Sequence, residues 1–235
     1  MRATIGHTAM VLAAGFGTRM RPLTDTTPKP LIHVAGQPII AYGFDRLRES
    51  HVTTAVVNAH YLPEQIVAWA KTQTIPETLI SDETDAILDT GGGILRALPL
   101  LGNDPFFVLN SDSFWIDHGQ PALQRLRNMW TDDMDCLLLL CDPKNTTGYD
   151  GIGDFRMAAD GRLTYDTANT LAYIGCYLVH PRLFANAPDG KFSMMILWKQ
   201  AIKNATLYGL AHQGHWLHVG TPEAISEAES FLKRA

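Results

Sequence analysis

Short apolar runs alternate along this chain with longer segments in which apolar residues recur every three or four positions. The apolar runs predict strands at 9–13, 54–57, 78–80, 106–109 and 134–140. The longer periodic segments predict helices that start at Pro38 and Pro63, and a third helix over 94–98 whose N-terminus is a run of three glycines. Alternation of strands and helices is typical of a mainly parallel sheet covered on both faces, so we predict an α/β protein.

The pattern changes after Asp142. Residues 153–157 and 162–165 read as an antiparallel hairpin around a turn with Gly161, and a further strand is predicted over 170–179. Near the end, Thr221 as N-cap and Pro222 at the first helical position predict an amphipathic helix through residue 232. No repeat, linker or low-complexity segment interrupts the chain, and we predict one domain over 1–235.

Composition and charge narrow the class of protein. The 235 residues are 46% hydrophobic, which is enough for a sizeable core, and the formal net charge of −5 argues against nucleic acid or an anionic membrane as partner. Cys136, Cys141 and Cys176 are an odd number without metal-ligand spacing, so we predict buried thiols in a reducing compartment. No run of eighteen apolar residues and no secretory signal is present, and a cytoplasmic location is expected.

The densest group of candidate functional residues lies at 12–31 (LAAGFGTRMRPLTDTTPKPL). Gly15 and Gly17 follow the first strand and allow the backbone to approach a ligand closely, so that exposed amides can bind phosphate. Arg19 and Arg21 add positive charge, and Lys29 stands between two prolines that fix its backbone. This combination indicates binding of a nucleoside triphosphate.

Two common nucleotide motifs are excluded here. A dinucleotide fingerprint requires a third glycine and an immediate helix, whereas a proline-rich loop follows Gly17. A Walker loop requires Gly-Lys followed by Ser or Thr, and the segment lacks it.

With these residues and with 89–96 (DTGGGILR), 110–113 (NSDS) and 214–221 (GHWLHVGT), the chain resembles the sugar-1-phosphate nucleotidyltransferases, enzymes that join a nucleoside triphosphate to a sugar 1-phosphate and release pyrophosphate. It resembles most the bacterial branch that uses UTP and N-acetylmuramate 1-phosphate in cell-wall recycling. The resemblance implies a Rossmann-like, three-layer mixed and mainly parallel sheet of the nucleotide-diphospho-sugar transferase type, without the C-terminal β-helix of some relatives. It also implies a nucleotide-binding half at about 1–142 and a sugar-binding half at about 143–235.

The resemblance further implies roles for individual residues. Arg19 would stabilise the β- and γ-phosphates, and Lys29 would bridge the sugar phosphate and the α-phosphate, which makes these two the catalytic candidates. Such a reaction needs positioning and electrostatic stabilisation rather than a nucleophilic side chain. The predicted nucleotide-binding residues are Leu12, Ala13, Ala14, Gly15, Gly17, Thr18, Arg19, Thr90, Gly91 and Asp112.

A metal site is predicted at Asp112. This carboxylate follows a predicted strand, at the edge where open α/β sheets bind ligands, and carboxylates suit Mg²⁺. The family pattern has a second aspartate where this chain has His218, and imidazole suits Mn²⁺, Zn²⁺ or Co²⁺ better than Mg²⁺. Three outcomes are open: Mg²⁺ on Asp112 with nucleotide and water, a preference for softer ions, or weak activity. We favour the first, with Mn²⁺ as the alternative ion and His218 bonded to a metal-bound water or phosphate.

Sugar contacts are predicted by position in the family, with His60 and Tyr61 at the cleft rim. Each of these side chains has an equally good structural role. The partners expected are a nucleoside triphosphate and a sugar 1-phosphate, with no nucleic acid and no membrane, for a monomer or small homo-oligomer. The alternatives are a hexose-1-phosphate guanylyl- or thymidylyltransferase, and a catalytically weak nucleotide-sugar sensor. The predicted sugar-binding residues are Asn110, Asp154, Asn169, Tyr173 and Gly175.

Overall fold

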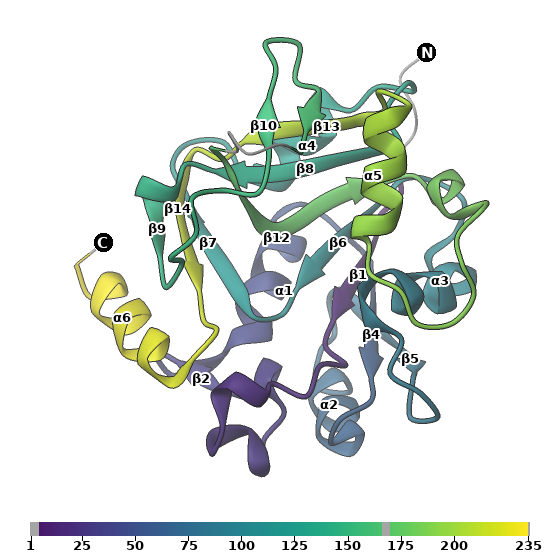
Figure 1. Cartoon of the computed structure of the whole chain (residues 1–235). Coiled ribbons are helices and arrows are strands. Elements are labelled where there is room, and N and C mark those ends of the chain that lie inside the picture. The colour runs from purple at the N-terminus through teal and green to yellow at the C-terminus, as the bar shows by residue number, and fades with distance from the viewer. Residues whose placement is uncertain (1–4, 166–169, 235) are drawn as a thin grey trace.

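A seven-stranded sheet forms the centre of the computed structural model, which describes residues 5–165 and 170–234 (Figure 1). One strand, β12, runs antiparallel to both of its neighbours, and the other neighbouring pairs are parallel. The prediction of a mixed, mainly parallel sheet is therefore confirmed. In spatial order the strands are β13 (Leu207–Ala211), β8 (Cys136–Cys141), β12 (Ala172–Val179), β6 (Phe106–Asn110), β1 (Thr8–Leu12), β4 (Thr54–Ala59) and β5 (Glu77–Asp82).

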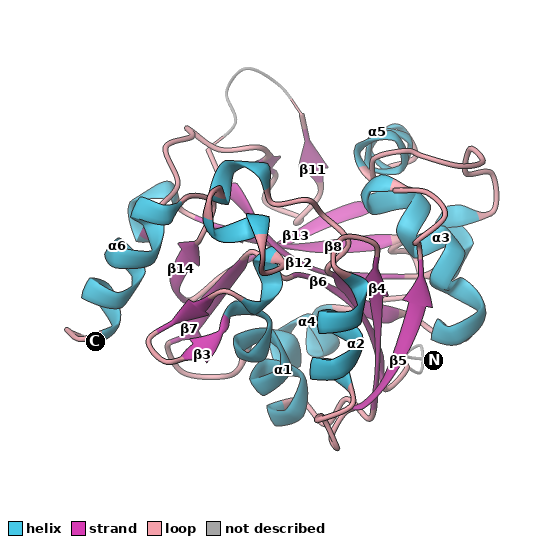
Figure 2. Ribbon diagram, turned by 90° about the horizontal axis from the view of Figure 1, so that it is seen from below, coloured by secondary structure: helices cyan, strands magenta, loops and turns pink. Residues whose placement is uncertain are grey.

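Helices cover both faces of this sheet (Figure 2). Alternate residues of β1 show why: Val11 packs in a core with α1, α2 and α4, whereas Met10 faces the opposite core with α3 and α5. Since both faces are buried, the strands are nearly continuous apolar runs, as the sequence indicated. The helices are α1 (Ile39–Glu49), α2 (Pro63–Ala70) and α4 (Ala122–Met129) on one face, and α3 (Asp89–Leu101) and α5 (Met195–Lys203) on the other.

A smaller sheet stands beside the central one, with strand order β7-β14-β9. The last helix covers it through a third apolar cluster that includes Phe114, Leu217 and Ala228. The Thr221 hydroxyl accepts from the amide of Ala224, which confirms the predicted N-cap. The elements are β7 (Ser113–Asp117), β14 (Gly214–His218), β9 (Thr146–Thr147) and α6 (Pro222–Leu232).

The hairpin, the C-terminal helix and the three cysteines agree with their predictions. The hairpin exists as β10 (Arg156–Met157) paired with β11 (Leu163–Thr164), and the chain from β14 onward forms a helix rather than a β-helix. The three cysteines are free and buried, as predicted. None of the helices within 5–165 and 170–234 has the length and apolar character needed to cross a membrane. A short two-stranded unit, β2 (His33–Val34) with β3 (Gln37–Pro38), precedes α1.

Helix α3 differs from its prediction. It begins at Asp89, two residues before the glycines that were predicted as its N-terminus, so the three glycines lie within its first turns. Glycine is a poor helix former, but here the bare backbone is required by packing. A Cβ at Gly91 would lie 2.3 Å from the Phe192 ring, and one at Gly92 would lie 2.3 Å from the carbonyl oxygen of Gly190.

This packing leads to a prediction about stability. Replacing Gly92 by alanine should lower the free energy of unfolding by about 2 kcal/mol or more, because a backbone carbonyl cannot move away as a flexible side chain would. Urea denaturation measures the change. Gly15→Ala is the matched control, since a Cβ there would meet no atom within 4 Å. Equal stability of the two variants would contradict this account of the glycines.

Candidate nucleotide and sugar-phosphate site

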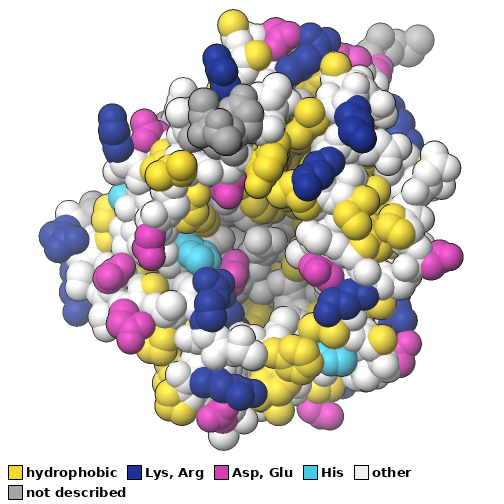
Figure 3. Space-filling model, viewed as in Figure 1, with side chains coloured by type: hydrophobic (Ala, Val, Ile, Leu, Met, Phe, Trp, Pro, Cys, Tyr) yellow, Lys and Arg dark blue, Asp and Glu magenta, His cyan; other side chains and the backbone are white. Residues whose placement is uncertain are grey.

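The cavity lies where the chain order of the central strands reverses, between β1 and β6. These parallel strands end side by side, with Leu12 opposite Asn110. Open α/β sheets bind ligands at such a point, beyond the carboxyl ends of the strands. A cavity of about 430 Å³ opens there, and Figure 3 shows the hollow in the middle of this face with charged side chains on both sides. Its lining includes Leu12, Ala13, Ala14, Gly15, Gly17, Thr18, Arg19, Lys29, Thr90, Asn110 and Asp112, all predicted from the sequence.

The glycine-containing loop wraps around the stem of Lys29. Gly17 has a φ of 62°, and a Cβ there would lie 2.9 Å from Cβ of Lys29 and 2.9 Å from the Thr24 side chain. The hydroxyl of Thr24 donates to the Gly17 carbonyl at 2.9 Å and closes the loop. Gly17 is thus required for the loop to fold against Lys29, which is itself buried in the short 3-10 helix Lys29–Leu31.

Lys29 makes an ion pair with the predicted metal ligand. Its Nζ lies 3.0 Å from Oδ2 of Asp112, and the two side chains are 11% and 30% exposed. Burial alone would raise the pKa of Asp112, but Lys29, His218 and Arg19 outweigh it and hold this pKa below its usual value. The carboxylate is therefore kept charged, as a cation ligand must be.

His218 lies beside Asp112, because β14 pairs with β7 and places His218 opposite Ser113. The Nε2 atom is 3.9 Å from Oδ2 of Asp112, while Nδ1 lies 3.1 Å from the Gly148 carbonyl oxygen. A carbonyl accepts only from a protonated nitrogen, so in neutral His218 the Nε2 atom carries the lone pair toward Asp112. It can accept a hydrogen bond from a water bound to a cation, or bind the cation itself.

These residues fit a divalent cation that is completed by the substrate. No group of three or more His, Cys, Asp or Glu side chains suited to a metal occurs in the described part of the chain. A charged Asp112 next to the Nε2 lone pair of His218 is a partial ligand set, and Mg²⁺ usually combines one or two protein ligands with phosphate oxygens and water. Asp112 would hold the ion, which would neutralise charge on the phosphates.

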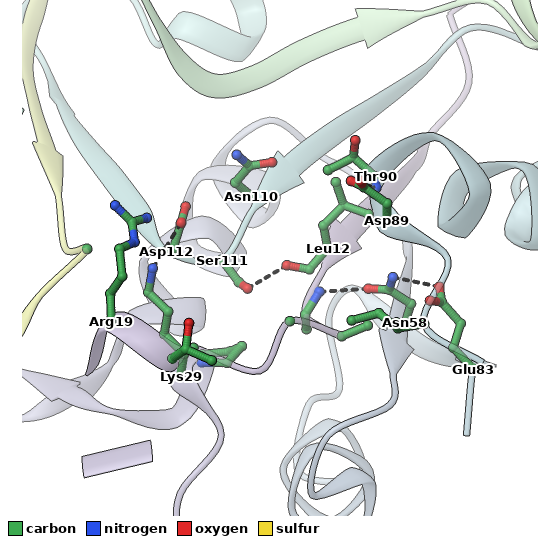
Figure 4. A pocket seen from close by; sticks show the side chains of 18 of the residues that line it. Leu12, Arg19, Lys29, Asn58, Glu83, Asp89, Thr90, Asn110, Ser111 and Asp112 are labelled. Carbon is green, nitrogen blue, oxygen red and sulfur yellow. Dashed lines mark hydrogen bonds and ion pairs between the residues drawn. The ribbon is translucent and has the colours of Figure 1, made fainter. Parts of the chain in front are cut away.

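A buried polar pair that the sequence did not reveal forms the opposite end of the cavity (Figure 4). The side chain of Asn58 accepts from the amide of Ala13 at 2.6 Å and donates to Oε1 of Glu83 at 2.7 Å. Glu83 is 0% exposed, and its Oε2 has no hydrogen-bond partner among the described residues. Burial raises the pKa of Glu83, although Asn58 and the nearby Leu88 amide oppose it. Glu83 lines the cavity, and its enclosed Oε2 can accept from a ligand once the covering side chains move aside.

The start of α3 is fixed by a segment from the second half of the chain. The amides of Gly91 and Gly92 donate to the Phe192 carbonyl at 2.9 and 3.1 Å, and the Thr90 hydroxyl accepts from the amide of Met194. Gly91 is consequently the one predicted nucleotide-binding residue that does not line the cavity. Lys191, which the sequence did not single out, reaches the lining from this segment.

The predicted sugar-binding residues are partly brought together. Gly175, with a φ of 82°, lies where a Cβ would be 3.0 Å from Cβ of Asn110, and Asn110 lines the cavity. Asp154 accepts from the Tyr173 amide at 2.8 Å, and the Tyr173 ring packs on Trp198 at 5.0 Å. Asp154, Tyr173 and Gly175 are not part of the lining. Asn169 lies outside the described residues.

The two residues predicted at the rim support the glycine-containing loop. The rings of His60 and Tyr61 contact Phe16, with centroids at 5.3 and 5.6 Å. Nδ1 of His60 also lies 2.6 Å from the Glu83 carbonyl oxygen. These contacts give both side chains a structural role next to the cavity, since neither belongs to its lining.

The cavity therefore has two chemically different ends. Arg19, Lys29 and Asp112 stand at one end, and Asn58 and Glu83 stand at the other, across Leu12 (Figure 4). Cations suit phosphates, and a partly buried end with hydrogen-bonding side chains suits a base. No side chain in the lining is placed as an activated nucleophile, so the arrangement suits transfer between phosphates by positioning and charge stabilisation.

Several known proteins are similar to this chain in sequence or in fold. Over 235 aligned residues the chain is 42% identical to an N-acetylmuramate alpha-1-phosphate uridylyltransferase of Caulobacter vibrioides, covering 97% of each chain. It is 34% identical to the enzyme of the same name from Neisseria meningitidis, covering 94% of this chain and 96% of the other. A UDP-glucose pyrophosphorylase complexed with UDP-glucose shares the fold, with a TM-score of 0.81 at 19% identity over 99% of this chain and 100% of that one. A family model described as nucleotidyl transferase matches residues 8–235. This chain belongs to the nucleotidyl transferase family and is an enzyme that transfers nucleotidyl groups to sugar 1-phosphates.

Proposed function

We propose that this enzyme transfers the uridylyl group of UTP to N-acetylmuramate 1-phosphate, releasing pyrophosphate and forming a nucleotide sugar for cell-wall recycling. The observation that carries the proposal is the 42% identity to the Caulobacter vibrioides uridylyltransferase over 97% of both chains. We also propose a cytoplasmic location, where nucleoside triphosphates are available, and a division into a nucleotide-binding half and a sugar-binding half.

The positive charges of Arg19 and Lys29 support binding of the phosphates at their end of the cavity. Arg19 would bind the β- and γ-phosphates that leave as pyrophosphate. Lys29 would bridge the attacking sugar phosphate and the α-phosphate, because its stem is fixed by the loop and its ammonium already faces Asp112 at 3.0 Å. Asp112 would hold a divalent cation, with Mg²⁺ as first candidate and Mn²⁺ as the alternative. A sugar phosphate is ionised at neutral pH, so no general base is required.

Glu83 supports a preference among bases. When ionised, its unpartnered Oε2 can only accept a hydrogen bond. Uracil, thymine and guanine carry a ring N–H on the pairing edge, whereas cytosine and adenine carry a bare nitrogen there. This favours UTP, and it keeps GTP and dTTP, the nucleotides of the alternative hexose-1-phosphate transferases, ahead of CTP and ATP.

A substrate panel tests the proposal. Pyrophosphate release is measured for UTP, GTP, dTTP and CTP against the 1-phosphates of N-acetylmuramate, N-acetylglucosamine, glucose and mannose, with Mg²⁺ or Mn²⁺. The expected result is the highest kcat/KM for UTP with N-acetylmuramate 1-phosphate. A higher value for a hexose 1-phosphate would replace this proposal by the alternative transferase. Absence of release with every pair would favour a nucleotide-sugar sensor that lost activity with its second carboxylate.

A further inference from the structure

One peptide bond in the wall of the cavity is held from both sides by buried side chains. It joins Leu12, the last residue of β1, to Ala13. The hydroxyl of Ser111 donates to the carbonyl oxygen of Leu12 at 2.5 Å (Figure 4). On the other side, Oδ1 of Asn58 accepts from the amide of Ala13 at 2.6 Å. Asn58 and Ser111 are 2% and 6% exposed, and both line the cavity.

The orientation of the Asn58 amide group is itself fixed. Its oxygen can face the Ala13 amide only if its nitrogen, which is a donor, faces an acceptor. That acceptor is Oε1 of the fully buried Glu83, which lies 2.7 Å from Nδ2 of Asn58. Gly93 leaves the space for this pair, since a Cβ there would lie 2.7 Å from Oε1 of Glu83 and 2.9 Å from Nδ2 of Asn58. Asn58 therefore holds the Ala13 amide in one geometry.

The Leu12–Ala13 peptide directs the loop that follows it. A peptide group is planar, so fixing its oxygen and its N–H sets the direction in which the chain leaves β1. Gly15 and Phe16 come soon after, and within residues 5–165 and 170–234 neither of their amides has a hydrogen-bond acceptor. Gly15 lines the cavity, and a Cβ there would meet no atom within 4 Å. Amides that can bind phosphate thus depend for their direction on this peptide.

We propose that Asn58 and Ser111 are positioning residues, which hold the Leu12–Ala13 peptide so that the loop is shaped for the triphosphate before the nucleotide binds. Without them the nucleotide would have to order the loop, and the free energy of that ordering would be lost from binding. Both side chains act through the backbone, so neither needs to touch the substrate. The inference rests on the proposed function for its choice of nucleotide and deepens it, because it adds two residues to those that prepare the triphosphate site.

The competing explanation is that the two side chains only stabilise the end of β1. Asn58→Ala and Ser111→Ala each remove one hydrogen bond to the peptide, and Ser111→Ala does so without removing the partner of Glu83. Ser111→Thr keeps the hydroxyl and is the conservative variant. Thr8→Ala is the matched control: the Thr8 hydroxyl donates to the Leu101 carbonyl at 2.9 Å, at the opposite end of β1 and outside the lining.

The experiment measures kcat and both KM values with UTP, N-acetylmuramate 1-phosphate and Mg²⁺, and Kd for UTP by titration calorimetry, at a temperature well below every Tm. Asn58→Ala and Ser111→Ala should raise KM and Kd for UTP about fivefold or more. The kcat and the KM for the sugar phosphate should stay close to those of the wild type, because the loss falls on nucleotide binding. Thr8→Ala and Ser111→Thr should bind UTP like the wild type.

Three results would overturn the inference. The first is a lower Tm with unchanged KM and Kd for UTP in both alanine variants, which would leave the side chains a structural role alone. The second is an equal loss of UTP binding in Thr8→Ala, which would indicate general loosening of β1. The third is a loss in Asn58→Ala but none in Ser111→Ala, which would assign the effect to Glu83.

Failure of the proposed function would look different. The wild type would then release no pyrophosphate from UTP and N-acetylmuramate 1-phosphate, while calorimetry with UTP would still compare the variants. A wild type that does not bind UTP would reject the choice of nucleotide. The same comparison with the nucleotide that the substrate panel favours would then decide whether Asn58 and Ser111 position the loop.

Discussion

Replacing Lys29 by alanine is expected to lower kcat by about 10²- to 10³-fold or more, while the protein stays folded. Removal of one preorganised group that stabilises charge in the transition state typically has an effect of that size. The Lys29 side chain is only 11% exposed and is aimed at Asp112 from a stem held by two prolines and the loop around Gly17. Pyrophosphate release with saturating substrates measures the effect, and circular dichroism checks the fold.

Lys71→Ala is the matched control for this experiment, because Lys71 is exposed and does not line the cavity. It should turn over like the wild type. Calorimetry adds a second readout: Lys29→Ala should weaken sugar-phosphate binding while Mg²⁺ binding is retained, because Asp112 loses a competing cation. Near-normal turnover in Lys29→Ala would refute the catalytic role proposed for this residue.

Replacing Asp112 by asparagine is expected to weaken Mg²⁺ binding to the nucleotide complex by at least about 100-fold. The surrounding cations hold the pKa of Asp112 low, with Nζ of Lys29 at 3.0 Å and Nε2 of His218 at 3.9 Å from its Oδ2. Within residues 5–165 and 170–234, no group of three or more potential metal ligands surrounds it. Titration calorimetry of Mg²⁺ and Mn²⁺ in the presence of UTP measures the loss. Asp25→Asn, which removes an exposed carboxylate outside the lining, is the control.

His218→Asp completes that test. A second carboxylate at this place should strengthen Mg²⁺ binding about tenfold, because the affinity for hard cations rises with the number of charged oxygen ligands. In the wild type we expect Mg²⁺ to bind through Asp112, nucleotide and water, with Nε2 of His218 accepting from a water ligand. Far tighter binding of Mn²⁺ than of Mg²⁺ to the wild type would show instead that the imidazole binds the ion directly.

The sheet could be predicted from sequence because burial on both faces makes its strands recognisable without knowledge of their neighbours. Runs such as 106–109 and 134–140 need no partner to be identified as strands. The start of α3 could not be predicted in this way. Three consecutive glycines disfavour a helix locally, and the reason that they tolerate one is Phe192, about a hundred positions away. Tertiary packing overrides propensity there.

The same limit explains which site residues were found. Arg19, Lys29 and Asp112 stand in glycine-, proline- or serine-rich strings next to a predicted strand, so local pattern and resemblance sufficed. Asn58 and Glu83 are single polar residues at strand ends, and only the bond between them, across 25 positions, marks them as part of the cavity. His218 lies close to Asp112 because β14 pairs with β7, and no local sequence pattern specifies that pairing.

The two hydrogen bonds from the Gly91 and Gly92 amides to the Phe192 carbonyl also affect how the chain folds during synthesis. The strand β12, which lies between β6 and β8, likewise comes late in the chain. A nascent polypeptide that has emerged only as far as residue 142 therefore lacks both the strand that joins β6 to β8 and the carbonyl that accepts from the start of α3. The lining of the cavity is complete only once the chain extends to Gly220. The two proposed halves thus both contribute to one cavity, and its assembly depends on contacts between residues far apart in the sequence.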